Sequence, residues 1–265
     1  MNNSRIVIAD IHGCANTFKA LLDKLPEGIP VTVSGDYVDR GPRSNEVIQL
    51  MIDRNIEGTF GNHEQMMLDF FEEHPDLLTK VGTYEMRGWN VFLGNGGDST
   101  LISYGYSFPV SMSRNYTLID IPEDKTQLIS HLEWIKNLPV YREYSECVND
   151  EGRKLIVSHS SINDYYSKKD DPNMKTNIIW NRHVTKGGIK DIPTIYNVFG
   201  HTVLEETRIR VPFAAIDRGC VFKEEKHGIL IALEYPSMKI YEQENIDWFY
   251  YINMILNHRI IMYMK

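Results

Sequence analysis

The chain has 265 residues, enough for one large domain or two small ones and for a core that needs no covalent staples. Its 36 acidic residues against 28 basic ones give a net charge of −8, which argues against a protein that grips duplex nucleic acid. Three scattered cysteines exclude a disulfide framework, and no apolar stretch is long enough to cross a bilayer, so we expect a cytoplasmic protein with no membrane partner.

The first third of the chain alternates short apolar runs with helical patterns. Apolar runs at residues 5–9, 31–34 and 56–60 are each followed by a pattern that predicts a helix, over about 15–25, 44–54 and 64–73. This alternation is typical of a largely parallel sheet with helices on its faces.

The remainder predicts a second sheet. Residues 79–120 are rich in Gly, Asn, Ser and Tyr, which predicts short helices and loops, and a helix is expected from near Pro122 to about Asn137. Short β-branched and aromatic runs from "VYREY" to "HGILIALEY" then favour a mixed or antiparallel sheet. We therefore expect a single α/β domain over residues 1–265, a two-sheet β-sandwich of mixed strands flanked by helices. The aromatic tail 246–265 is predicted to be a packed helix or strand, or a partner surface.

Polar side chains follow five of the strand-like runs. They are Asp10 and His12, then Asp36, Asp39 and Arg40, then Asn62 and His63, then His159, and finally His201. Glycines flank each cluster and allow sharp turns around a compact centre. Carboxylates, imidazoles and an amide oxygen without thiolates suit a divalent cation such as manganese, iron or zinc, and two adjacent cations would account for the number of ligands.

The motifs "DIHG", "GDYVDRG", "GNHE", "SHS" and "GHT" occur in this order between Asp10 and Thr202. The set resembles the calcineurin-like metallophosphoesterases, and more narrowly the bacterial and phage branch of the phosphoprotein phosphatase family, which contains serine/threonine protein phosphatases. The resemblance implies a metal-dependent hydrolase with a dinuclear centre of two divalent ions, manganese first, with iron or zinc as alternatives. It also implies in-line attack on phosphorus by a hydroxide that the two metals activate.

The resemblance also implies individual roles. One metal would be held by Asp10 and His12 and the other by Asn62, His159 and His201, with Asp36 bridging the two. Arg40, in "DRG", and Arg182, in "IIWNRHV", would bind the phosphate oxygens. His63 would act as the general acid, and Asp39 would orient it and raise its pKa. Glu64 is expected to support the loop rather than to bind metal.

The motifs leave more than one class of substrate open. The leading prediction is a serine/threonine protein phosphatase acting on a phosphorylated protein or peptide, because "GDYVDRG" and "GNHE" match that family tightly. The alternative is a diadenosine polyphosphate hydrolase or another nucleotide phosphohydrolase, because relatives with nearly the same motifs cleave such anhydrides. A third hypothesis, a non-catalytic phosphopeptide-binding or metal-binding module, conflicts with the presence of every proposed ligand. One departure, Arg218 where the family commonly has threonine, either adds positive charge near the site or pairs with a surface carboxylate.

Overall fold

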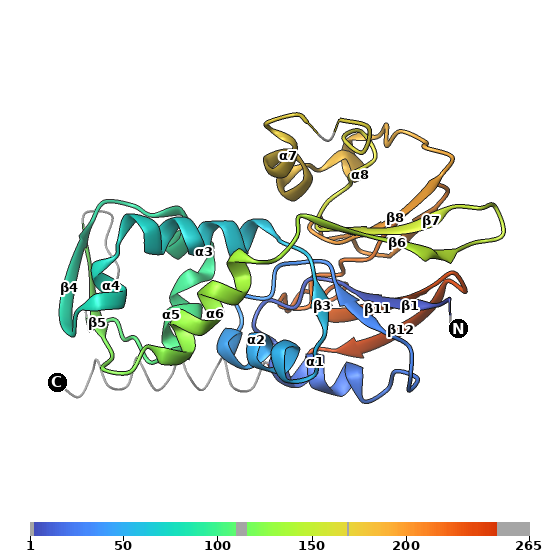
Figure 1. Cartoon of the computed structure of the whole chain (residues 1–265). Coiled ribbons are helices and arrows are strands. Elements are labelled where there is room, and N and C mark those ends of the chain that lie inside the picture. The colour runs from blue at the N-terminus through green and yellow to red at the C-terminus, as the bar shows by residue number, and fades with distance from the viewer. Residues whose placement is uncertain (1–2, 110–115, 169, 248–265) are drawn as a thin grey trace.

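The computed structural model describes residues 3–109, 116–168 and 170–247, and two five-stranded sheets packed face to face dominate it (Figure 1). The first sheet has the strand order β12–β11–β1–β2–β3. Its strands are β1 (Arg5–Ile8), β2 (Val31–Val33), β3 (Glu57–Gly58), β11 (Ile229–Tyr235) and β12 (Lys239–Glu244). Strands β1, β2 and β3 run parallel, whereas β11 is antiparallel to both β1 and β12, so the sheet is mixed.

The second sheet has the order β6–β7–β8–β10–β9. Its strands are β6 (Tyr141–Val148), β7 (Lys154–Ser158), β8 (Ile195–Phe199), β9 (Arg208–Arg210) and β10 (Phe213–Ala215). The three central strands β7, β8 and β10 run parallel, and an antiparallel strand closes each edge.

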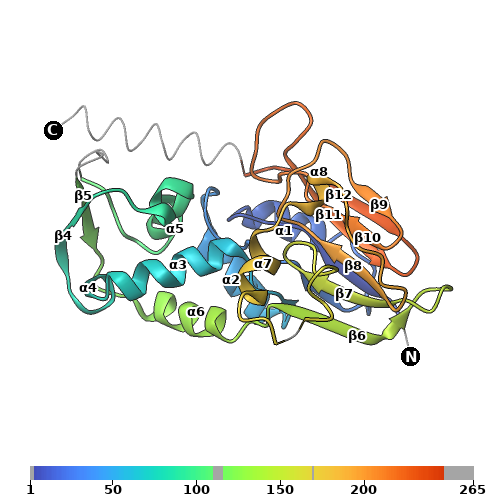
Figure 2. The ribbon, with the colours of Figure 1, turned by 90° about the horizontal axis from the view of Figure 1, so that it is seen from above.

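Helices surround the two sheets, and several of them lie beside the sandwich rather than on it (Figure 2). The α-helices are α1 (Ala15–Leu22), α2 (Ser44–Asp53), α3 (Asn62–Glu73), α4 (Asp76–Thr79), α5 (Asp98–Ser103), α6 (Thr126–Lys136), α7 (Met174–Trp180) and α8 (His183–Lys186). Helices α1 and α2 lie against the first sheet, and α7 and α8 lie on the far side of the second (Figure 1). The predicted architecture, a mixed two-sheet sandwich flanked by helices, is confirmed.

Successive side chains of a strand point to opposite faces of the sheet, and in β1 the side chains on both faces are buried. In β1, Val7 faces the other sheet and packs in a cluster with Val157 of β7 and Ala214 of β10. Ile6 and Ile8 point the opposite way, into the core beneath the helices. A strand that is apolar on both faces therefore has no solvent side, which is why residues 5–9 read as a continuous apolar run.

The middle of the chain departs from the prediction of short helices and loops. Strands β4 (Gly82–Arg87) and β5 (Tyr116–Ile121) pair antiparallel, far from the two large sheets (Figure 1). Their pairing joins residues about 30 to 40 positions apart, so no local turn signal announces it. The predicted short helices correspond to a one-turn π-helix over Leu93–Gly97 and to α5.

Two further predictions concern residues 56–60 and the C-terminal tail. The strand expected over residues 56–60 is reduced to Glu57–Gly58, because its partner β2 ends at Val33. The prediction for the tail falls largely on residues 248–265, outside the described residues. Within the described ranges, no helix combines the length and apolar character needed to cross a membrane.

His131 on α6 gives the fold a testable pH dependence. It is 1% exposed, its Nδ1 accepts a hydrogen bond from the Tyr104 hydroxyl at 2.7 Å, and its Nε2 donates to Gln49 at 3.2 Å, so the pair of bonds fits the neutral ring. Burial lowers the pKa of His131 from 6.5 to about 4. Between these values the unfolded chain binds a proton that the folded chain does not, so stability is lost as the pH falls.

We therefore expect His131 to account for a loss of about 2 kcal/mol in the free energy of unfolding between pH 7.5 and pH 5. Urea unfolding at both pH values, compared between the wild type and His131→Gln, checks this. The variant should be less stable at pH 7.5 but should lose less stability on acidification. An equal loss in both proteins would contradict the assignment.

Candidate metal centre

The polar residues predicted as site residues sit on strained loops at the ends of the parallel strands. Non-glycine residues with positive φ number seven in the described ranges, and five of them are His12, Asp36, Asp39, Arg40 and His201. Such backbone conformations are costly for residues other than glycine and persist where the surrounding structure enforces them, commonly at functional sites. The loops after β1, β2 and β8 therefore hold their side chains in fixed directions.

One buried cluster groups His12, Asp36 and His63. The Nδ1 of His12 donates to the carbonyl of Val38 at 2.8 Å, which leaves its Nε2 facing the Asp36 carboxylate at 3.6 Å. The Nε2 of His63 lies 3.9 Å from the same carboxylate oxygen. Two imidazole nitrogens thus converge on one oxygen of Asp36.

A second buried cluster shares Asp36 and adds residues from the other sheet. The Nδ1 of His159, after β7, donates to the Ser34 carbonyl at 3.0 Å, and its Nε2 lies 3.3 Å from Asp36 Oδ1. This nitrogen also lies 2.8 Å from Asn62 Oδ1 and 3.1 Å from His201 Nδ1. The structure therefore places Asp36 between two groups of potential ligands, as the bridging prediction requires.

Asp10 lies beside the second cluster. Both of its carboxylate oxygens accept the His201 backbone N–H, at 3.0 and 3.1 Å. Burial, followed by repulsion from Asp217 and Asp36, raises the pKa of Asp10 well above its usual range. Three buried carboxylates this close together are unfavourable without cations.

Asp217 is the site residue that sequence reasoning missed. It is 2% exposed, and burial raises its pKa to about 6. It follows the end of β10, which is the same placement that identified the other candidates. The placement after a strand was therefore a usable signal for Asp217, although no motif marks it.

The lack of a side chain at Gly200 lets the loop after β8 approach the centre. A methyl group there would overlap Asp10 Oδ1 and crowd the Ser34 hydroxyl. Gly61 is equally constrained, because a methyl group would overlap Asp36 Oδ1. Both glycines thus keep the two carboxylates close to the strands that carry the histidines.

His63, in the first turn of α3, forms the pair predicted with Asp39. The His63 Nδ1 lies 2.6 Å from Asp39 Oδ2, and the Thr100 hydroxyl donates to Asp39 Oδ1 at 2.7 Å. The expected rise in the pKa of His63 is not the net effect here, because burial lowers that pKa to about 4 while Asp36 acts in the opposite direction. The ring orientation is nevertheless fixed, with Nε2 turned toward Asp36.

The two predicted phosphate arginines occupy different positions. The guanidinium of Arg40 reaches the centre, with Nη1 2.7 Å from His12 Nε2. Arg182 is exposed at the start of α8, next to the clusters. Burial, assisted by positive charges that include Arg182 and Arg40, lowers the pKa of His159 to about 3. Both arginines therefore act electrostatically on the centre.

Glu64 lies beneath the centre and organises the backbone. Its carboxylate accepts hydrogen bonds from the N–H groups of Asp36 at 2.9 Å, Tyr37 at 2.8 Å and Gly61 at 3.0 Å. It thereby satisfies donors of the "GDYVDRG" loop and of the start of α3 together. This is the loop-supporting position expected for Glu64.

Arg218 forms no ion pair with a carboxylate of the described residues. Its guanidinium donates to the Lys226 carbonyl at 2.9 Å and so holds the loop between β10 and β11.

The donor set fits two divalent cations. His12 and His159 use Nδ1 for backbone carbonyls, which turns each Nε2 toward Asp36, where a metal could replace its present contact with Arg40 or with Asn62 and His201. Buried carboxylates, neutral imidazoles and the Asn62 amide oxygen are ligands suited to manganese, iron or zinc.

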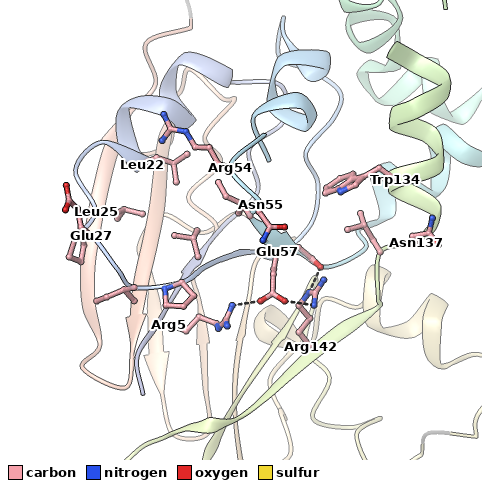
Figure 3. A pocket seen from close by; sticks show the side chains of 17 residues that line it. Arg5, Leu22, Leu25, Glu27, Arg54, Asn55, Glu57, Trp134, Asn137 and Arg142 are labelled. Atoms are coloured by element: carbon pink, nitrogen blue, oxygen red, sulfur yellow. Dashed lines mark hydrogen bonds and ion pairs between the residues drawn. The ribbon is translucent and has the colours of Figure 1, made fainter. Parts of the chain in front are cut away.

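A cavity of about 780 Å³ lies elsewhere, at the beginning of β3 (Figure 3). Glu57 projects into it between two arginines and pairs with Arg5 at 2.5 Å and with Arg142 at 2.9 Å. The Tyr144 hydroxyl donates to the same carboxylate at 2.9 Å. This network joins strands β1, β3 and β6, and none of the predicted site residues lines the cavity.

Comparison with known proteins gives relatives of nearly the same length. The chain is 27% identical over 260 residues to a bis(5'-nucleosyl)-tetraphosphatase PrpE [asymmetrical] of Geobacillus thermodenitrificans, covering 88% of this chain and 90% of the relative. A crystal structure with the provisional name diadenosine tetraphosphatase matches with a TM-score of 0.59 at 15% identity, over 91% of this chain and 93% of that one. The cold-active protein-tyrosine phosphatase of a Shewanella species matches with a TM-score of 0.53, again at 15% identity, over 91% and 80% of the chains.

At such identities, the two solved structures support the fold alone. The family model for calcineurin-like phosphoesterases matches residues 5–205, which is well over half of the chain and includes all of the predicted metal ligands. Members of this family are hydrolases that normally bind two divalent metals. The sandwich fold, the paired histidine and aspartate clusters and this match together show that the chain belongs to the calcineurin-like phosphoesterases.

Proposed function

We propose that the chain is a dinucleoside polyphosphate hydrolase that uses two divalent metals. The observation that carries the hydrolytic part is the position of Asp36, which is shared by two buried ligand clusters beside the Arg40 guanidinium. The substrate class is supported by the near full-length similarity to bis(5'-nucleosyl)-tetraphosphatases. This preference reverses the ranking that the motifs alone suggest.

In this proposal, Asp10 and His12 would hold one metal and Asn62, His159 and His201 the other, with Asp36 within reach of both. When bound, the ions would polarise the phosphoryl group and supply an activated water near neutral pH. Arg40 and Arg182 bind the non-bridging phosphate oxygens, for which a forked guanidinium is well suited. His63, oriented by Asp39, would donate a proton to the leaving oxygen, which requires the anionic substrate to raise the low pKa of its ring on binding.

A second candidate is a serine/threonine protein phosphatase of the phosphoprotein phosphatase family. It is favoured by "GDYVDRG" and "GNHE", together with the His63–Asp39 pair that these motifs bring within 2.6 Å. The same ligand clusters would serve a phosphomonoester as well as an anhydride, so the chemistry of the centre does not separate the two candidates.

A direct comparison of substrates separates them. Initial rates in manganese are measured on diadenosine tetraphosphate and on a panel of phosphoserine and phosphothreonine peptides, with Asp36→Asn as the blank. We expect a kcat/KM at least about tenfold higher on the dinucleotide, a difference of about 1.4 kcal/mol in transition-state binding. If kcat/KM is instead about tenfold higher on the peptides, the proposal is overturned in favour of the second candidate.

A further inference from the structure

A second pocket adjoins the candidate metal centre. It has a volume of about 390 Å³, which lies within the range of small-molecule sites, roughly 300–1,000 Å³. Its walls come from three separate segments, namely the loop from Arg40 to Pro42, the turn from Gly94 to Gly96, and Val221 with Phe222. Cys14, Asn245 and Asp247 complete the lining.

The floor of this pocket is held by hydrogen bonds. The Asn245 amide donates to the Cys220 carbonyl at 2.7 Å, and its oxygen accepts the Asp247 backbone N–H, also at 2.7 Å. The Asp247 carboxylate accepts the backbone N–H and the hydroxyl of Thr17, at 2.9 and 2.7 Å. These donors already occupy the Asp247 carboxylate, and they weaken the negative charge that it presents to the pocket.

The aromatic wall is fixed as well. The Phe222 N–H donates to the Gly219 carbonyl at 2.9 Å, and the Gly228 N–H donates to the same oxygen at 2.9 Å. Gly219 has φ +62°, and a methyl group there would come within 2.8 Å of the Phe222 ring. Arg218 closes the loop through its bond to Lys226. Phe222 thus stands half-buried in a preformed position.

Arg40 connects this pocket to the metal centre. Its guanidinium carbon lies 5.5 Å from the centroid of the Phe222 ring, while its Nη1 lies 2.7 Å from His12 Nε2. The Arg40 backbone N–H donates to the Gly96 carbonyl at 3.0 Å, which ties the arginine to the opposite wall. A phosphate held by Arg40 would therefore have an aromatic pocket next to it.

We propose that this pocket binds one nucleoside of a dinucleoside polyphosphate, with the base packed on Phe222 and its phosphates extending past Arg40 to the metal centre. The inference rests on the proposed function, because a phosphopeptide would bring no base to the pocket. Its physical basis is that every nucleobase has a flat apolar face, whereas the lining around Phe222 offers apolar surface and a nearby guanidinium.

The test compares two substrates that differ only in the nucleosides, diadenosine tetraphosphate and inorganic tetrapolyphosphate, for the wild type and Phe222→Ala in manganese. Loss of one stacking contact should raise KM for the dinucleotide roughly 5- to 100-fold. The change in KM for tetrapolyphosphate should be at least fivefold smaller. Phe222→Tyr, which keeps the ring, should restore the wild-type KM for the dinucleotide. Tyr241→Ala on β12 is the matched control for loss of a half-buried aromatic away from the pocket.

The outcomes separate the two proposals. If the wild type cleaves diadenosine tetraphosphate but Phe222→Ala leaves its KM unchanged, the pocket inference is overturned and the proposed function stands. Equal losses on both substrates also overturn it, because they would mean that Phe222 only positions Arg40. If the wild type fails on the dinucleotide while cleaving phosphopeptides, the proposed function fails first, and the inference fails with it.

A second variant covers the case in which Phe222→Ala does not fold. Asn95 lies half-exposed on the wall formed by the turn at Gly94–Gly96, so Asn95→Trp would fill the pocket without removing any core contact. We expect it to raise KM for the dinucleotide more than KM for tetrapolyphosphate. Equal effects on the two substrates would overturn the inference by this route too.

Discussion

An Asp36→Asn variant is expected to lose bound metal and to fall by more than roughly 100-fold in kcat/KM, the upper range for changes merely adjacent to metal ligands. The reason is that Asp36 is the one carboxylate common to both ligand clusters. Asparagine is nearly isosteric and tolerates the positive φ of 53° at this position, so the loop should keep its shape. Elemental analysis after reconstitution with manganese, together with initial rates, provides the measurement.

The wild type should approach two metals per chain and the variant one or fewer. A wild-type stoichiometry that stays at one would contradict the dinuclear centre. Without metal, the variant should melt no lower than the wild type, because removing the Asp36 charge relieves its repulsion of Asp10. Asp23→Asn, at an exposed side chain paired with Arg54, is the matched control and should change neither metal content nor rate.

Replacing His63 by Gln is expected to lower kcat by at least ~100-fold while leaving KM and metal content close to wild type. His63 is the imidazole that faces the centre while its other nitrogen is held 2.6 Å from Asp39. A general acid matters most for a poor leaving group. The measurement therefore compares phenyl phosphate with p-nitrophenyl phosphate, and the loss should be larger on the former.

Asp39→Asn provides the companion measurement. This variant keeps the shape of the pair and the contact with Thr100 but weakens the hydrogen bond that orients the histidine ring. Its kcat should therefore fall less than that of His63→Gln, and the fall should again be larger on phenyl phosphate. If His63→Gln loses metal, or loses activity equally on both phenyl esters, His63 is a ligand rather than the acid. Its membership of a potential ligand cluster makes that outcome a real alternative.

The sequence predicted the fold class and most of the candidate site because both depend on one local rule. Parallel strands end at the same edge of a sheet, so polar residues directly after apolar runs converge even when they are far apart in sequence. His159 and His201 lie 42 positions apart, after the parallel neighbours β7 and β8, and approach within 3.1 Å of each other, as that rule requires. The motif order then indicated which polar residues belonged together.

Features that depend on packing were not predicted. The β4–β5 hairpin arises from pairing between distant residues, and the low pKa of His63 arises from burial by residues that only the folded chain brings near it. Thr100, which bonds to Asp39, comes from a helix whose sequence carries no mark of that role. Asp217 follows closely after a strand and could have been predicted on that ground, but none of the recognised motifs includes it.

The sandwich itself determines how far apart the two ligand clusters can be. His12 and Asp36 follow strands of the first sheet, whereas His159 and His201 follow strands of the second, so the separation of the clusters depends on how closely the two sheets pack. Glu57 of the first sheet bonds to Arg142 and Tyr144 of the second, so these contacts cross the same boundary (Figure 3). Ions bound at both clusters would join the layers a second time. Sheet packing and metal affinity are therefore thermodynamically linked, and each should strengthen the other.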